Sequence, residues 1–231
     1  MKYLTITGAD SDTNIEQMAA LSVAYPFLEW GILYGGGHLS SNRFPGHEWR
    51  DQLAQDPDFQ TMNISAHLCG QSVRNYLRGK LDLQLLPDLL FRKADRIQIN
   101  THGEPHVSKN WFWDTFNEYT IGPEPEIIFQ LDGVNNHYLI LGEAVGIKCT
   151  GLFDLSHGAG VLQDGWPSTS TWRGYAGGLG PDNLEEELRK ISKVATNKYW
   201  IDMETNVRTR GVLDLNKVRQ VCEIAQPFHK P

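Results

Sequence analysis

Three glycine-rich or polar turns in the last third of the chain have the composition of an anion-binding site. They follow short apolar runs and cover residues 156–160 (SHGAG), 175–184 (YAGGLGPDNL) and 205–211 (TNVRTRG). A glycine lets its backbone N–H approach a ligand with no Cβ in the way, and a helix start adds partial positive charge. We predict that a phosphate is held by the N–H groups of Gly158, Gly160, Gly177, Gly178 and Asn206. The alternative for the middle turn is a strand-to-helix connection whose glycines only permit tight packing.

Carboxylates stand at or just after the ends of three predicted strands. Asp154, in LFDLSHG, is our candidate for a catalytic proton donor. Asp132, in FQLDG, could contact a substrate or could cap the turn that follows it. Asp202 and Glu204 are two residues apart, so in a strand both would face one side, where they could share a proton or bind a cation. One of them could instead fix a loop by accepting backbone N–H bonds.

Two further groups could do chemistry if they point into the interior of the fold. His67 and Cys69, in AHLCG, alternate along a strand, and either could supply a base from its inward face. The alternative is a packed histidine and a small buried thiol. Glu29 lies inside the apolar run 27–35, where a charge is costly without a partner, so we expect a partner for it in the interior.

Composition and charge exclude several classes of function. The 231 residues are 40% hydrophobic, enough for a sizeable core, yet no apolar run reaches the ~18 residues that a membrane helix needs. The net charge of -7 argues against a nucleic-acid surface but allows a small anionic ligand. The three cysteines form no CxxC pair, and no secretory signal is visible. We therefore expect a cytoplasmic protein with no zinc site, disulfide framework or cofactor.

Eight short apolar runs, most followed by a helical-looking segment, predict the fold. They are rich in Ile, Leu, Tyr and Phe and are often continuous, as in strands buried on both faces. The predicted strands are 3–7, 27–35, 62–70, 96–100, 126–132, 149–155, 173–178 and 198–203. Eight such units favour an α/β fold, a single-domain (β/α)8 TIM barrel over residues 1–231. The alternative is an open doubly wound sheet, which more often has fewer strands and a glycine-rich turn after the first.

Helices and loops complete the predicted barrel. Caps and apolar spacing predict helices at 12–25, 180–194 and 214–226. Residues 35–59 are predicted to be a long loop after the second strand, and residues 161–172 a loop in place of the sixth helix. Long loops of this kind shape the mouth of the active site in barrel enzymes.

The C-terminal third resembles the phosphoribosylanthranilate isomerase family, a branch of the ribulose-phosphate-binding barrels. YAGGLGPDNL is similar to that family's LAGGL-x-P-x-N-V turn, and WIDMETNVRTRG to its V-D-V-S-S-G-V-E stretch and the glycine after it. LFDLSHGAG resembles its LLD followed by GGTG; upstream, LTITG stands where the family has KICG, and SSNRFP resembles SPRYV. The resemblance implies a (β/α)8 enzyme of tryptophan biosynthesis that converts a phosphorylated aminoaldose into an aminoketose by an Amadori rearrangement.

The resemblance also implies roles for particular residues. The family's general acid, the aspartate of LLD, is matched by Asp154, and the arginine of SPR by Arg43, which could bind a substrate carboxylate in a bidentate way. The family's general base, the cysteine of KICG, is matched by Thr7, whose hydroxyl has no useful basicity at neutral pH. Thr7, Cys69 and His67 are therefore the candidates that we consider for this half of the acid–base pair.

We predict a phosphoribosylanthranilate isomerase-like enzyme that isomerises a phosphorylated sugar or aminosugar by general acid–base catalysis. Its partner would be a small phosphorylated substrate, with no nucleic acid or membrane, and the chain would be a monomer or a homodimer. Arg43, Asp132 and Glu204 are the candidates for substrate binding. The alternatives are a diverged, non-catalytic barrel that binds a phosphate ligand, and a metal-dependent epimerase or aldolase that uses His67, Asp202 or Glu204.

Overall fold

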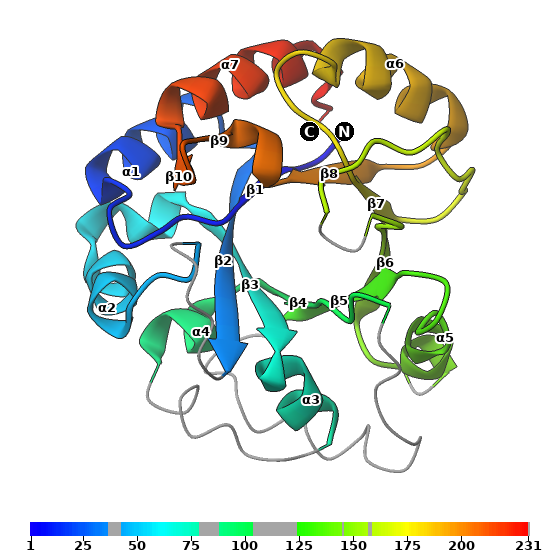
Figure 1. Ribbon diagram of the computed structural model, residues 1–231, viewed down its shortest axis with the longest axis horizontal. Coiled ribbons are helices and arrows are strands. Elements are labelled where there is room, and N and C mark those ends of the chain that lie inside the picture. The colour runs from blue at the N-terminus through cyan, green and yellow to red at the C-terminus, as the bar shows by residue number, and fades with distance from the viewer. Residues whose placement is uncertain (37–42, 79–87, 104–123, 145, 157–158, 231) are drawn as a thin grey trace.

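Eight parallel strands close into a barrel, as predicted (Figure 1). The computed structural model describes residues 1–36, 43–78, 88–103, 124–144, 146–156 and 159–230. The strands are β1 (Leu4–Thr7), β2 (Leu28–Gly36), β3 (Asn63–Gly70), β4 (Arg96–Ile99), β5 (Glu126–Leu131), β6 (Cys149–Phe153), β7 (Arg173–Ala176) and β8 (Tyr199–Met203). Each strand pairs with the next, and β8 pairs with β1 through Leu4 and Ile201. This closure decides for the barrel over the open doubly wound sheet.

Helices cover the outside of the barrel (Figure 1). They are α1 (Ile15–Ala24), α2 (His47–Gln55), α3 (Gln71–Leu77), α4 (Leu89–Lys93), α5 (His137–Ala144), α6 (Leu184–Val194) and α7 (Leu215–Ala225). The three predicted helices correspond to α1, α6 and α7, and α7 begins where the Asp214 side chain accepts the N–H groups of Asn216 and Lys217.

Residues 35–59 contain a helix, so treating this whole segment as a loop was wrong. Trp49 and Leu53 are one helical turn apart, and both are buried on the inner face of α2. The prediction for residues 161–172 is confirmed, because this segment connects β6 to β7 without a helix.

The two ends of the chain meet on the outside of the barrel (Figure 1). The amino group of Met1 donates to the carbonyl of Phe228 at 2.8 Å, and the N–H of Lys230 donates to the carbonyl of Met1 at 3.0 Å. These bonds hold the C-terminal segment beside the start of β1.

The barrel interior contains both polar side chains and an apolar cluster. Side chains that alternate along a strand face opposite sides, so Leu4 and Ile6 pack under the helices while Thr5 and Thr7 face inward. The inward residues of β1 to β4 are mostly polar or charged and are buried: Thr5, Thr7, Glu29, Ser65, His67, Arg96 and Gln98. The inward residues of β5 to β8 include a separate apolar cluster of Ile128, Leu152, Ala176 and Trp200, together with the buried polar side chains of Gln130 and Asp202.

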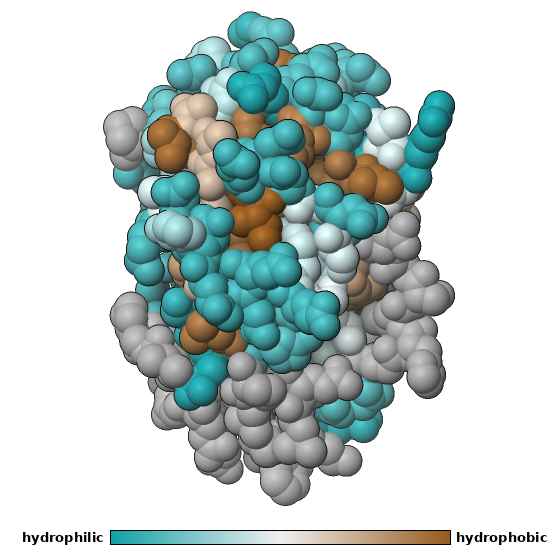
Figure 2. Space-filling view, turned by 90° about the vertical axis from the view of Figure 1, so that its left-hand side faces the viewer, coloured by the Kyte–Doolittle hydropathy of each residue, from teal (hydrophilic) through white to brown (hydrophobic). Residues whose placement is uncertain are grey.

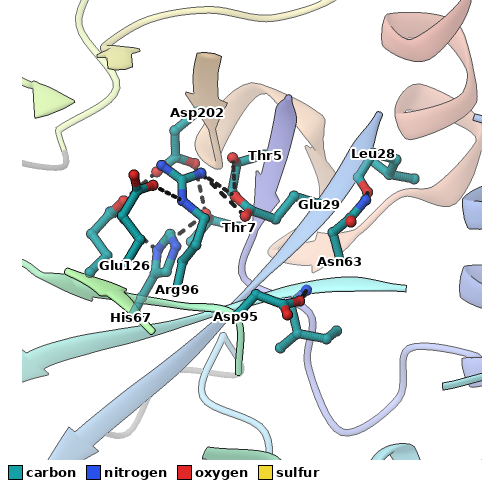
Figure 3. A network of polar contacts seen from close by, with 12 residues as sticks. Thr5, Thr7, Leu28, Glu29, Asn63, His67, Asp95, Arg96, Glu126 and Asp202 are labelled. Atoms are coloured by element: carbon teal, nitrogen blue, oxygen red, sulfur yellow. Dashed lines mark hydrogen bonds and ion pairs between the residues drawn. The ribbon is translucent and has the colours of Figure 1, made fainter. Parts of the chain in front are cut away.

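A buried ion cluster lies near the N-terminal ends of the strands (Figure 3). Arg96, the first residue of β4, donates to Glu29 on β2 and to Glu126 on β5, in each case at 3.0 Å. The guanidinium of Arg96 also lies 4.2 Å from the centre of the Trp200 ring, and Thr5 donates to Glu29 at 2.7 Å. Glu29 therefore has the interior partner that its place in an apolar strand led us to expect.

The outer surface beside α1 and α2 is largely hydrophilic, with hydrophobic side chains in small separate groups (Figure 2). Among the described residues, no helix has both the length and the apolar character needed to cross a membrane.

Candidate active site

The C-terminal ends of the strands open into a cavity of about 590 Å³, where barrel enzymes place their chemistry. The predicted site residues that line it are Thr7, Arg43, His67, Cys69, Asp154, Gly160, Gly177, Gly178, Asp202, Glu204 and Asn206. Of the two other predicted residues, Gly158 lies outside the described residues, and Asp132 is not part of this lining.

The loops that follow β6, β7 and β8 converge at one side of the cavity. Gly178 packs against the backbone of Leu162, and a Cβ on Gly160 would come within 2.9 Å of the Thr205 side chain. The Asn206 amide donates to the carbonyls of Gly178 at 3.0 Å and Leu179 at 3.2 Å, which ties the last two loops together. Three loops from separate strand ends therefore share one wall.

Two glycines at this wall have backbone N–H groups with no protein partner. Gly177 and Gly178 have φ of +115° and +69°, a region that glycine adopts without strain. Within the part of the chain that the structure describes, neither N–H donates a hydrogen bond to a protein group. Because buried or half-buried N–H groups need acceptors, these two donors are suited to an anion in the cavity.

Asp154 lies just beyond the end of β6, with its carboxylate held from two sides. Gln130 on β5 donates to one oxygen at 2.8 Å, while the hydroxyl and the N–H of Ser156 donate to the other at 2.7 and 3.1 Å. Asp154 is 8% exposed, so it is fixed in the cavity wall and still reaches the open space. A carboxyl group held in this way can deliver a proton to a bound ligand in a defined direction.

A second carboxyl group, that of Asp202, lines the cavity, and Figure 3 shows it together with Thr7. The Thr7 hydroxyl donates to one of its oxygens at 2.7 Å, and the Gln98 amide donates to the other at 3.3 Å. Burial raises the pKa of Asp202 to about 7, although both hydrogen bonds lower it; the nearby Glu204 and Asp154 carboxylates raise it further. Asp202 can therefore exchange a proton at neutral pH.

His67 and Cys69 also line the cavity, but their surroundings oppose a role as the base. Burial, together with the positive charge of Arg96, lowers the pKa of His67 to about 3, so the imidazole is neutral and only weakly basic. Burial raises the pKa of Cys69 to about 12, and the thiol accepts a hydrogen bond from Asn100 at 3.4 Å. A thiol with this pKa stays protonated at neutral pH and is a poor nucleophile and base.

Arg43 forms an ion pair at the mouth of the cavity. Its guanidinium lies 2.9 Å from the Glu204 carboxylate, and the two side chains are 37% and 19% exposed. Burial raises the pKa of Glu204, while the charges of Arg43 and Arg208 lower it. Arg43 therefore faces an acid that the protein itself supplies.

Asp132 holds loops together. Its carboxylate accepts hydrogen bonds from the Thr101 hydroxyl, the Gly103 N–H at 2.9 Å and the backbone and amide of Asn135 at 2.8 and 3.1 Å. Burial alone would raise the pKa of Asp132, but these hydrogen bonds lower it overall. The turn-capping alternative fits this geometry, and contact with a ligand in the cavity does not.

Two segments of the chain are similar in sequence to proteins of the same name. No protein-family model matches the chain. A segment of 94 residues is 34% identical to an N-(5'-phosphoribosyl)anthranilate isomerase of Zygosaccharomyces bailii, and covers 37% of this chain and 43% of that protein. A segment of 70 residues is 36% identical to an N-(5'-phosphoribosyl)anthranilate isomerase of Endomicrobium trichonymphae. It covers 29% of this chain and 32% of that protein. Over these segments the chain is similar to phosphoribosylanthranilate isomerases. Its matches span less than half the length of each of these two proteins.

Solved structures of phosphoribosylanthranilate isomerases share the barrel over nearly the whole chain. The enzyme from Pyrococcus furiosus covers 98% of this chain and all of its own, with 15% identity and a TM-score of 0.55. A complex with reduced 1-(o-carboxyphenylamino)-1-deoxyribulose 5-phosphate covers the same shares, with 16% identity and a TM-score of 0.58. These likenesses support the fold.

The chain departs from the motifs of the phosphoribosylanthranilate isomerases where charge is concerned. The first serine of the family's SSGVE stretch is matched by Glu204, and its glutamate by Arg208. Arg208 donates to Asp10 at 3.2 Å and to the carbonyl of Gly8, and so ties the loop after β1 to the loop after β8. Glu204 adds a carboxylate to the cavity itself.

Sequence reasoning missed two residues of the site. Gln98 donates to Asp202, and Ser156 donates to Asp154. The run RIQIN carried a signal for Gln98, because Arg96, Gln98 and Asn100 alternate with isoleucines and therefore share the inward face.

The metal-dependent alternative needs several metal-ligating side chains close together. Among the described residues, no three His, Cys, Asp or Glu side chains come together in a metal-binding arrangement. His67, Asp202 and Glu204 therefore make no such cluster in this part of the chain.

Proposed function

We propose that the chain is a phosphosugar isomerase that converts a phosphorylated aminoaldose into an aminoketose, as its likeness to the phosphoribosylanthranilate isomerases implies. One observation carries the proposal: the N–H groups of Gly177 and Gly178, which have no partner among the described residues, share a cavity with the Asp154 and Asp202 carboxyl groups. A phosphate bound at the glycines would hold the sugar with its reacting carbons among these carboxyl groups.

The first step falls to Asp154. The carboxyl group of Asp154 gives its proton to the ring oxygen, the C1–O bond breaks with its electron pair on that oxygen, and the nitrogen lone pair forms a C1=N bond. The result is an open chain with a protonated imine at C1. Ser156 and Gln130 hold the Asp154 carboxyl group in place during this transfer.

The far end of the substrate would face Arg43. A substrate carboxylate can form two parallel hydrogen bonds with a guanidinium, which gives both affinity and orientation. Here Glu204 already pairs with Arg43, so a carboxylate must displace Glu204 to bind. We therefore expect weaker binding of a carboxylated aglycone than Arg43 alone would give.

Two measurements test the proposed function. Purified protein is assayed for conversion of N-(5'-phosphoribosyl)anthranilate by loss of its fluorescence. Binding of reduced 1-(o-carboxyphenylamino)-1-deoxyribulose 5-phosphate is measured by calorimetry, with the dephosphorylated compound as the matched control. We expect turnover, and binding that depends on the phosphate.

The outcome separates the proposal from the non-catalytic alternative. Phosphate-dependent binding without turnover, unchanged by Asp154→Asn, would support a barrel that only binds a phosphate ligand. Binding that is equal for the phosphorylated and dephosphorylated compounds would exclude the phosphate site. Gly178 is unsuitable for this test, because any side chain there would collide with the backbone of Leu162 and disturb the loop.

A further inference from the structure

The acid–base pair lacks the base that the family motif places on the first strand. Thr7 occupies that position, and its hydroxyl is committed to a hydrogen bond with Asp202 on the neighbouring strand. The bond is 2.7 Å long, so an oxygen of Asp202 lies beside the place where the family's sulfur is expected. Both residues line the cavity.

We propose that the Asp202 carboxylate is the base that takes the C2 proton of the opened substrate, and that Thr7 is a positioning residue for it. This inference rests on the proposed function. Thr7 and Gln98 each donate to one oxygen of Asp202, which fixes the plane of the carboxylate without supplying a positive charge. Neutral donors reduce the basicity of a carboxylate less than a paired cation would.

The proposed step is balanced within the acid–base pair. Asp202 takes the proton from C2, the C2–H electron pair forms a C1=C2 bond, and the C1=N electron pair returns to the nitrogen. Asp202 then gives its proton to C1, while the enol hydroxyl on C2 gives its proton to the ionised Asp154 and becomes the ketone. Both carboxyl groups end in the protonation state in which they began, and no co-reactant is needed.

Titratable groups on neighbouring elements influence the pKa of Asp202 and therefore the pH range in which it can act as a base. Asp154, which follows β6, and Glu204, which follows β8, raise its pKa through their charge. His67 on β3 is neutral and Cys69 is protonated, so neither adds a charge at neutral pH. A base whose pKa lies near the working pH combines a usable ionised fraction with enough basicity to take the proton.

Two experiments test this assignment. We expect kcat/KM to rise with pH through an inflection near 7 in the unchanged protein. Asp202→Asn should lower kcat by about 10²- to 10⁴-fold and abolish the inflection, while binding of the reduced analogue stays within about threefold. Thr7→Val should move the inflection up by about one pH unit, because the carboxylate loses a donor, and Thr7→Ser should leave it in place.

A rescue variant gives the second readout. In the Asp202→Asn background, Thr7→Cys restores the thiol of the family motif, and we expect about tenfold recovery with an inflection above pH 8, as a thiol titrates. If Asp202→Asn keeps kcat within threefold of the unchanged protein and the same inflection in its pH profile, the assignment of Asp202 is overturned but the proposed function is not. Absence of turnover by the unchanged protein would overturn the proposed function with it, so the two failures are distinguishable.

Discussion

Two buried carboxyl groups in the same barrel have opposite surroundings. Glu29, near the N-terminal ends of the strands, is 1% exposed and contacts the guanidinium of Arg96. Asp202, which lines the cavity, is 6% exposed, and among the described residues its side chain accepts from the neutral donors Thr7 and Gln98. Both lie on the inward face of the barrel.

The presence or absence of a neighbouring cation separates a buried acid that serves the fold from one that can exchange a proton. The acid beside a cation is fixed in its charged form, and removing either partner would leave an uncompensated buried charge. The acid without a cation is costly to ionise and can therefore exchange a proton near neutral pH. This division matches the general rule for barrels, in which one face serves stability and the other serves catalysis.

The largest expected effect is on catalysis at the cavity. Asp154→Asn removes the proposed proton donor and keeps one acceptor oxygen, which can serve either Ser156 or Gln130. We expect kcat to fall by about 10²- to 10⁴-fold, with the free energy of unfolding changed by less than about 1 kcal/mol. Steady-state kinetics and urea unfolding measure the two quantities. A large loss of stability would mean that this end of the barrel also serves the fold.

At the N-terminal ends of the strands we expect a loss of stability with little effect on catalysis. Arg96→Met leaves Glu29 buried without a cation, and we expect the free energy of unfolding to fall by about 3–5 kcal/mol. The matched control is Arg189→Met, which breaks an exposed ion pair with Glu185 and should cost less than about 1 kcal/mol. Folded Arg96→Met should retain most of its kcat. Equal effects of the two substitutions in urea unfolding would remove the distinction between the two ends.

The strands were predictable from sequence, whereas the pairs that make the site were not. Strands buried on both faces are apolar in sequence whatever their neighbours, so all eight were found close to their observed bounds. The pairing of Thr7 with Asp202 joins residues 195 positions apart and exists only because β8 closes onto β1. Likewise, the sequence shows that Glu29 needs a partner, but only the register across β3 identifies Arg96.

The raised pKa of Asp202 predicts a dependence of stability on pH. The pKa is about 7 in the folded chain against an ordinary 3.8, so the folded state binds more protons between these values. The contribution is therefore fully present below about pH 4 and is lost as the pH rises through 7, on the order of a few kcal/mol. Asp202→Asn should weaken this loss between pH 5 and pH 8 in urea unfolding. If Asp202→Asn loses as much stability between pH 5 and pH 8 as the unchanged protein, Asp202 ionises freely in the folded chain.

The smallest effect is expected at the mouth, where the ion pair between Arg43 and Glu204 is half-exposed. Glu204→Ser restores the serine of the family motif and frees Arg43 for a substrate carboxylate. We expect KM for N-(5'-phosphoribosyl)anthranilate to fall about tenfold, equivalent to about 1.4 kcal/mol, and KM for the analogue without the carboxylate to stay the same. Comparing the two substrates cancels any effect of Glu204 on Asp202. Glu204→Gln, which removes the charge and keeps the size, should act in the same direction; a similar fall for both substrates would show that space, and not charge, governs the mouth.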